Sequence, residues 1–192
     1  MSIRTRIEGN ARRILVTTAV AGTALAGTLG GITAAHAATN GIIVREQCTG
    51  VTGQISYQPG LQSAKTQQVR AVLSSTLTGC SDAFNGALGG SGSFTAVLTG
   101  KASLAAENFS GTFTINWPAS AGLNPSNGTL TVTESNGTEL VSGTVTSGAL
   151  TGFPVRVTYL TTGNTGTGTK KHPVTAQSFV NTQSLQLTQN EG

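Results

Sequence analysis

Side chains capable of acid–base or nucleophilic chemistry are scarce in this chain of 192 residues. After residue 37 it has one histidine, His172, one aspartate, Asp82, and five glutamates. A Ser-His-Asp triad would have to combine His172 and Asp82 with one of 16 serines. His172 stands between Lys171 and Pro173 in an expected loop, and no G-x-S-x-G elbow is present. We therefore expect no catalytic residues and a protein that is not an enzyme, with a hydrolase as the least favoured alternative.

Two other motifs could carry chemistry. Glu134 and Glu139 have the residue type of a glycosidase acid pair. They flank Asn136-Gly137, a dipeptide typical of tight hairpin turns, where charged side chains commonly lie in solvent. The run Gly89-Gly90-Ser91-Gly92 is the best candidate for a phosphate loop, but it precedes an expected strand and lacks a helix N-terminus. We interpret both motifs as turns.

The chain has two cysteines, Cys48 and Cys80. A metal site needs more ligands than these and His172 supply, and a reactive thiol needs a neighbouring base, which is not evident. In an exported protein an isolated cysteine pair usually forms a disulfide. Closing a loop of about 33 residues stabilises a fold by roughly 3–4 kcal/mol. We predict a Cys48–Cys80 disulfide, no metal site and no cofactor.

The first 37 residues have the three-part layout of a secretory signal peptide. Four arginines precede an uncharged stretch over residues 14–32, and Ala35-His36-Ala37 supplies the small residues of a cleavage site. We predict cleavage between Ala37 and Ala38 and a protein that is secreted or associated with the cell envelope. A membrane anchor is the alternative, but glycines and threonines make the stretch only weakly apolar. Arg12-Arg13 leaves twin-arginine export open beside the general secretory route.

Removal of this leader changes the charge of the protein. Residues 38–192 contain seven basic and six acidic residues, a net charge of +1, whereas the full chain has +4. The one remaining basic cluster, Lys170-Lys171-His172, follows the Gly/Thr-rich run 161–169, which we interpret as a hairpin tip or loop. We therefore expect no nucleic-acid partner and, after cleavage, no transmembrane segment.

Residues 38–192 are expected to form one all-β domain. Threonine, serine and glycine supply 63 of these 155 residues, and they favour strands with polar outer faces and frequent turns. Apolar and polar residues alternate in six segments: 69–77, 109–117, 130–132, 141–145, 153–159 and 185–187. Asn127-Gly128, Asn136-Gly137 and Pro59-Gly60 mark expected turns. The pattern predicts an antiparallel β-sandwich or closed β-barrel of about eight or nine strands.

The aromatic residues do not predict a sugar-binding face. Trp117 and Tyr159 share the apolar parity of their segments and are expected in the core, whereas Tyr57 could be exposed. The uncharged polar strand surface favours a non-enzymatic binding or structural module, with a cell-wall component as a candidate partner. The alternative is a carrier with an internal β-barrel cavity for a small apolar ligand, since the same apolar residues could line such a cavity.

Four short segments carry a resemblance to a known group. They are Cys48-Thr49-Gly50, Ser56-Tyr57-Gln58-Pro59-Gly60-Leu61, Leu77-Thr78-Gly79-Cys80 and Thr114-Ile115-Asn116-Trp117. In this order they resemble small secreted actinobacterial proteins of the Streptomyces type, over nearly all of residues 38–192. Many of those proteins have further cysteines, which this sequence lacks, so a second disulfide is not expected. The resemblance implies an exported β-domain and a bacterial host, and it implies no activity.

Overall fold

The computed structural model describes residues 42–190, except residues 84–85 and 136–137. The predicted signal peptide and its cleavage site between Ala37 and Ala38 lie outside the described residues. The strands are β1 (Ile42–Leu61), β2 (Gln67–Asp82), β3 (Gly86–Ala87), β4 (Gly92–Ser103), β5 (Ala106–Asn116), β6 (Ser126–Ser135), β7 (Thr138–Gly148), β8 (Pro154–Thr165) and β9 (Val174–Asn190). A 3-10 turn, η1 (Ala119–Ala121), follows β5. Among the described residues, no helix has the length and apolar character needed to span a membrane.

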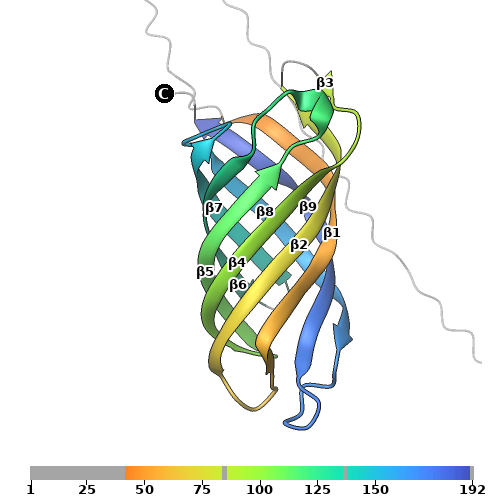
Figure 1. The fold of residues 1–192 in the computed structure, drawn as a ribbon, viewed down its shortest axis with the longest axis vertical. Helices are drawn as coiled ribbons and strands as arrows, with labels where there is room; N and C mark the ends of the chain where they lie inside the picture. The colour runs from red at the N-terminus through yellow and green to blue at the C-terminus, as the bar shows by residue number, and fades with distance from the viewer. Residues whose placement is uncertain (1–41, 84–85, 136–137, 191–192) are drawn as a thin grey trace, which may run out of the picture. The chain divides into compact units, whose positions relative to one another are not determined.

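Eight of the strands close into an antiparallel barrel (Figure 1). Each barrel strand pairs with the next one along the chain, and β9 returns to pair with β1. The short β3 lies outside this ring and pairs with the end of β2. The prediction of an antiparallel all-β fold is confirmed, and of the two architectures left open the structure has the closed barrel. Closure pairs the strand edges that an open sheet would leave exposed.

Alternate residues of each strand face the barrel interior because side-chain direction in a strand has a period of two. In β2, Val69, Leu73 and Leu77 are buried, whereas Arg70 and Ser74 between them are exposed. The same alternation in the other strands produces one continuous apolar core. The polar residues of the alternating segments form the outer wall, which is rich in threonine and serine.

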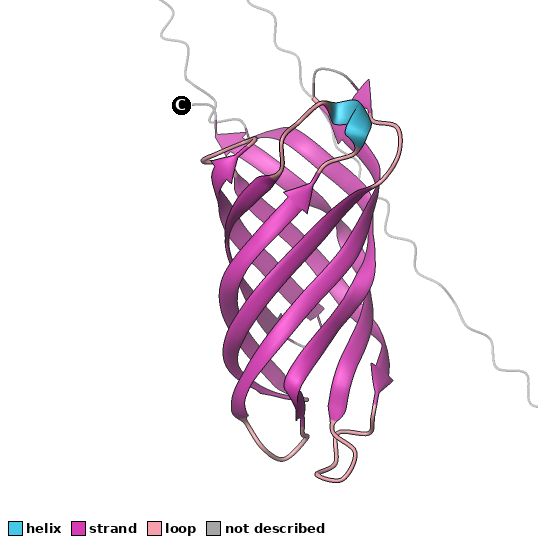
Figure 2. Cartoon of the chain, viewed as in Figure 1, coloured by secondary structure: helices cyan, strands magenta, loops and turns pink. Residues whose placement is uncertain are grey.

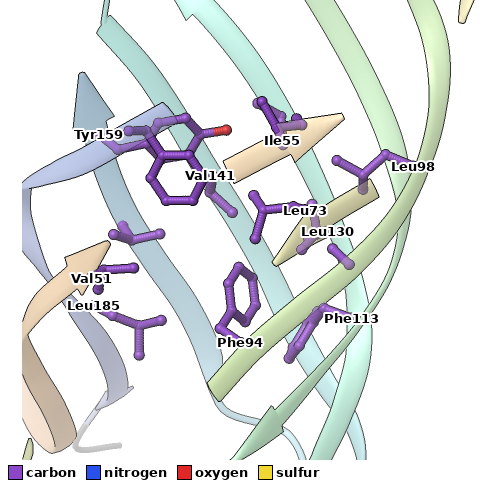
Figure 3. Close-up of a cluster of buried hydrophobic side chains, with 14 of the residues drawn as sticks. Val51, Ile55, Leu73, Phe94, Leu98, Phe113, Leu130, Val141, Tyr159 and Leu185 are labelled. Carbon is purple, nitrogen blue, oxygen red and sulfur yellow. The ribbon is translucent and has the colours of Figure 1, made fainter. Parts of the chain in front are cut away.

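The interior of the barrel is packed with side chains (Figure 3). The rings of Phe94 and Phe113 lie 5.6 Å apart between centroids, and those of Tyr159 and Phe179 lie 4.5 Å apart. Trp117 is also buried, so the expectation that Trp117 and Tyr159 belong to the core is confirmed. Burying a large apolar side chain stabilises a fold by about 1.5–3 kcal/mol.

Two expected turns lie inside strands. Asn127-Gly128 belongs to β6, where the register with β7 shifts, and so the prediction of a turn there is wrong. The glycine is needed because the ring of Phe113 covers it: a Cβ on Gly128 would lie 2.7 Å from that ring. Asn127 accepts a hydrogen bond from Thr114 across the strands. Pro59-Gly60 likewise lies within β1 and is not a turn, whereas Asn136-Gly137 is outside the described residues.

The two ends of the barrel differ. Cys48 and Cys80 form the predicted disulfide and lie directly opposite each other in β1 and β2, with their Cα atoms 3.9 Å apart. We call the end where β1 begins and β2 ends the disulfide end; η1 lies there too (Figure 2). The opposite end, where β1 ends and where β5, β7 and β9 begin, is the mouth.

Candidate functional site

Polar side chains from five strands meet inside the mouth. Tyr57 lies near the end of β1, Glu107 and Glu139 near the starts of β5 and β7, Thr161 toward the end of β8, and Gln177 near the start of β9. These strand ends surround the mouth because neighbouring strands of the barrel are antiparallel.

The strand period explains why the two glutamates point inward. Glu107 is two residues from the buried Phe109, and Glu139 is two residues from the buried Val141. Residues two apart in a strand share a face, so these carboxyl groups enter the barrel interior. Their exposed fractions are 6% for Glu107 and 3% for Glu139.

A pocket of about 330 Å³ lies at the mouth. It is lined by Leu104, Glu107, Glu134, Glu139, Thr161, Asn164 and Gln177. Three of these seven residues are acidic and none is basic, so the pocket has negative potential wherever its carboxyl groups are ionised.

The Tyr57 hydroxyl connects two walls of the mouth. Its oxygen lies 2.9 Å from Glu107 Oε1 and also contacts Gln177 Oε1. One hydroxyl proton can serve only one acceptor, so the second contact requires a proton on Glu107 or an amide of Gln177 turned with its nitrogen toward Tyr57. The residue is 5% exposed, which settles the open question of its exposure. Tyr57 therefore supports two residues of the pocket lining, Glu107 and Gln177, from behind.

Each of the two buried glutamates keeps one oxygen without a partner. Thr161 donates a hydrogen bond to Glu139 Oε1 at 3.2 Å. Glu107 Oε2 and Glu139 Oε2 are buried and accept no hydrogen bond from the described residues. The buried Tyr159 hydroxyl also lacks a partner of hydrogen-bond geometry, although it interacts with Glu139 closely enough to lower the pKa of that carboxyl group. A buried acceptor left in this way costs about 1–3 kcal/mol, and more if it is charged. Both residues line the pocket, but the two oxygens themselves are covered, so a molecule in the pocket meets them only when the carboxyl groups turn toward it.

Burial governs the ionisation of these groups. The pKa of Glu107 is raised from 4.5 to about 8, first by burial and then by the charge of Glu139, against the lowering effect of the Tyr57 hydrogen bond. Burial also raises the pKa of Glu139, which the hydroxyl groups of Tyr159 and Thr161 oppose. The tyrosines Tyr57 and Tyr159 have raised pKa values, again mainly from burial. Near neutral pH Glu107 thus favours its protonated form, and burial shifts Glu139 in the same direction.

The expectation that Glu134 and Glu139 both lie in solvent is wrong for Glu139. The two face each other in the β6–β7 pairing, but Glu139 points into the barrel, while Glu134 is half-buried at the rim. The buried partner that joins Glu139 in the pocket wall is Glu107, which the sequence patterns did not single out. The sequence signal for Glu107 was its spacing of two residues from Phe109, which places both side chains on the same face of the strand.

The other sequence candidates are not brought together. His172 is exposed in the connection between β8 and β9 at the mouth, whereas Asp82 ends β2 at the disulfide end. The two therefore lie at opposite ends of the barrel and cannot belong to one triad. Lys170 and Lys171 are exposed in the same connection as His172. Gly89-Gly90-Ser91 lies between β3 and β4, as a turn should.

A second acidic pair lies at the disulfide end. Glu46 is buried and faces Asp82 across the β1–β2 pairing. Its pKa is raised to about 8, first by burial and then by the hydrogen bond and charge of Asp82. No group of three or more His, Cys, Asp or Glu side chains suitable for a metal ion occurs in the part of the chain that the structure describes.

A larger concavity, of about 670 Å³, lies on the outer wall. It is lined by Gly111 and Gly143, by Leu130, and by threonine and serine residues of the same three strands. It contains no charged residue and no buried polar atom without a partner. The mouth pocket, although smaller, holds the reactive groups and is the better candidate site.

Comparisons of the chain with protein-family models, with curated proteins and with solved structures each find no match. The function of the mouth is therefore inferred from its geometry alone.

Proposed function

We propose that this protein is a secreted, non-enzymatic binding module that takes a small polar ligand into the mouth of its barrel. The observation that carries the proposal is the pocket whose wall holds two buried carboxyl oxygens without partners, Glu107 Oε2 and Glu139 Oε2. Buried polar groups in folded proteins are nearly always hydrogen-bonded, and exceptions with shifted pKa values concentrate at functional sites.

The carrier of a small apolar ligand is the alternative. The packed interior argues against it, because core side chains occupy the space such a ligand would need (Figure 3). The lining of the mouth also has one apolar residue, Leu104, against six polar or charged ones. A small polar ligand fits this lining better. The predicted signal peptide and the resemblance to secreted actinobacterial proteins support an extracellular or cell-envelope location for the binding step.

A second candidate function is general acid–base catalysis at the same mouth. It is favoured by one observation: the pKa of Glu107 is about 8, and its carboxyl group contacts the Tyr57 hydroxyl. A carboxylic acid that titrates near neutral pH is suited to donate a proton to a bound molecule. Binding and catalysis would then differ only in whether the bound molecule is returned unchanged.

Native mass spectrometry of the protein purified from its own culture medium tests the proposal. We expect a bound mass above that of residues 38–192 with one disulfide. A Leu104→Trp variant should lose this bound mass because the larger ring fills the pocket, whereas Leu160→Trp on the outer wall should retain it. Leu160 is 44% exposed and lies outside the mouth lining.

Two outcomes would change the proposal. An equal bound mass in the Leu104→Trp variant would place the ligand elsewhere and contradict the mouth as the site. A ligand that is chemically altered after incubation with the wild-type protein, but not with Glu107→Gln, would favour the catalytic alternative.

A further inference from the structure

The mouth presents titratable groups that are all acidic or phenolic. Glu107 from β5, Glu134 from β6 and Glu139 from β7 line the pocket. The buried Tyr57 from β1 and Tyr159 from β8 interact with Glu107 and Glu139 without lining it. The remaining pocket side chains, such as Gln177 from β9, are neutral. No lysine, arginine or histidine lines the pocket in the described part of the chain. The site therefore lacks a positive charge of its own.

Lysines do occur around the rim of the mouth. Lys65, Lys101, Lys170 and Lys171 are exposed in or beside the connections at this end. Exposed charges are screened by salt over about 8–10 Å at physiological ionic strength. They act on a ligand much more weakly than carboxyl oxygens that touch it inside the pocket. These lysines consequently do not decide which charge the pocket accepts.

The two free oxygens restrict the chemistry of an occupant. Glu107 Oε2 and Glu139 Oε2 need hydrogen-bond donors, and ionisation of the pair is opposed by mutual repulsion. A neutral hydroxyl compound can exchange hydrogen bonds with the protonated carboxyl groups, but it does not stabilise their ionised forms. A calcium ion takes about 6–8 oxygen ligands, and no group of three or more acidic, histidine or cysteine side chains suited to a metal ion is found among the described residues. An ammonium group supplies both the charge and three donors.

We propose that the mouth binds a small aliphatic primary amine, with its ammonium group held by the carboxyl groups of Glu107 and Glu139, which line the pocket. Glu134 at the rim is placed for the second ammonium group of a diamine. This inference rests on the proposed function, since it names the ligand class of the same pocket. The pocket volume of about 330 Å³ accommodates a short aliphatic chain.

Binding of an ammonium group is coupled to release of protons. Without a ligand, burial shifts both carboxyl groups toward their protonated forms, and the bound ammonium requires the ionised form. Affinity therefore increases with pH until the carboxyl groups are ionised in the free protein. For one released proton the expected increase is about tenfold per pH unit.

Isothermal titration calorimetry of the intact secreted protein with 1,4-diaminobutane tests this inference. We expect binding at pH 8, about tenfold weaker binding at pH 7, and a heat that varies with the ionisation enthalpy of the buffer because protons are released. The neutral isostere 1,4-butanediol should not bind. Magnesium chloride should not compete with the diamine.

Matched variants locate the interaction. Glu107→Gln and Glu139→Gln keep the shape of the side chains and remove their charge, so each should weaken diamine binding at pH 8 at least about tenfold. Glu46→Gln removes another buried glutamate with a raised pKa, but at the disulfide end, and should leave binding unchanged. Circular dichroism of each variant shows whether the barrel remains folded.

The outcomes separate this inference from the proposed function. Equal binding of the diamine and the diol, or unchanged diamine binding in both Glu107→Gln and Glu139→Gln, would overturn the amine assignment. If the diamine does not bind but a natural ligand is still displaced by Leu104→Trp, the assignment fails and the proposed function stands. If no ligand of any kind occupies the mouth, both fail.

Discussion

Glu107 and Glu139 are single residues that work against the stability of their own fold. Each places a carboxyl group in an interior built from apolar side chains, and each leaves one oxygen without a partner. Replacing either with an apolar residue of similar volume would remove this cost. Under the proposed function, a ligand that pairs with these carboxyl groups offsets that cost.

The first prediction concerns the pH dependence of stability. A carboxyl group whose pKa is 4.5 when unfolded and about 8 when folded binds more protons in the folded state between those values. The free energy of unfolding should therefore fall as pH rises from 5 to 8, by on the order of 1 kcal/mol per pH unit per group. Urea denaturation at pH 5, 6.5 and 8 measures this slope.

Glu107→Gln provides the control for that slope. The amide does not titrate, so the decline in stability between pH 5 and 8 should become shallower than in the wild type. Glu46 has a pKa of about 8 at the other end of the barrel and contributes a decline of the same sign, so some slope should remain. A wild-type protein that becomes more stable toward pH 8 would contradict the assigned pKa values.

At the level of single residues, the sequence predicted part of the site. The isolated cysteines correctly indicated their disulfide. His172 and Asp82, the histidine and aspartate that the sequence offered for a triad, lie at opposite ends of the barrel. The position of Glu139 was missed because its neighbouring turn dipeptide suggested solvent, whereas its parity with Val141 decides its direction. Glu107 and Gln177 meet through strands far apart in the chain, and a single sequence does not show that pairing.

Individual strands are shaped by glycines at their bends. Gly128 in β6 lies beneath the ring of Phe113 from β5, at a shift in the register between β6 and β7. Gly143 in β7 likewise leaves room for Leu130 of β6. Side chains at these positions would separate adjacent strands, so the curvature of this wall depends on the missing Cβ atoms.

The second prediction tests this role of Gly128. Gly128→Ala places a Cβ 2.7 Å from the Phe113 ring and should lower the free energy of unfolding by about 1–3 kcal/mol. Gly89→Ala is the matched control, because nothing lies within 4 Å of its added Cβ. Thermal denaturation of both variants compares them directly. Equal melting temperatures would show that the wall adjusts to the added methyl group.

The third prediction concerns the hairpin of β1 and β2. The Cys48–Cys80 disulfide joins residues 32 apart in sequence at the disulfide end of this hairpin. The double variant Cys48→Ala/Cys80→Ala should lose about 3–4 kcal/mol of stability, since the unfolded chain regains the entropy of an open loop. Reduction of the wild type should lower its melting temperature in the same direction. A melting temperature that is insensitive to both changes would mean that the backbone pairing of β1 and β2 stabilises the hairpin without the disulfide.

The strands themselves were largely predictable from the sequence. Alternation over residues 69–77 falls within β2, and that over residues 109–117 falls in β5 except for its last residue, because the inward face of a barrel strand must be apolar. Asn127-Gly128 was wrongly predicted as a turn, because this dipeptide, although favoured in turns, here leaves room for an aromatic ring. The choice between sandwich and barrel depends on whether β9 pairs with β1, a contact between the two ends of the domain that local patterns do not contain.

The whole molecule depends on that closing pair. β1 and β9 pair on both sides of a register shift between Cys48 and Thr52. The side chain of Asn181 spans this irregular stretch: its Oδ1 accepts a hydrogen bond from the Val51 amide at 2.9 Å, and its Nδ2 donates to Thr49 O at 2.8 Å. One amide side chain thus replaces backbone hydrogen bonds where the two strands fall out of register.

The last prediction follows from this arrangement. Asn181→Ala leaves the Val51 amide without its acceptor and should cost about 1–3 kcal/mol of stability, with faster hydrogen exchange confined to β1 and β9. Asn116→Ala is the control, because it removes an exposed hydrogen bond to Ser93 away from this seam. If Asn181→Ala instead accelerates exchange evenly around the ring, the barrel opens as one cooperative unit and the β1–β9 seam is no weaker than its other pairings.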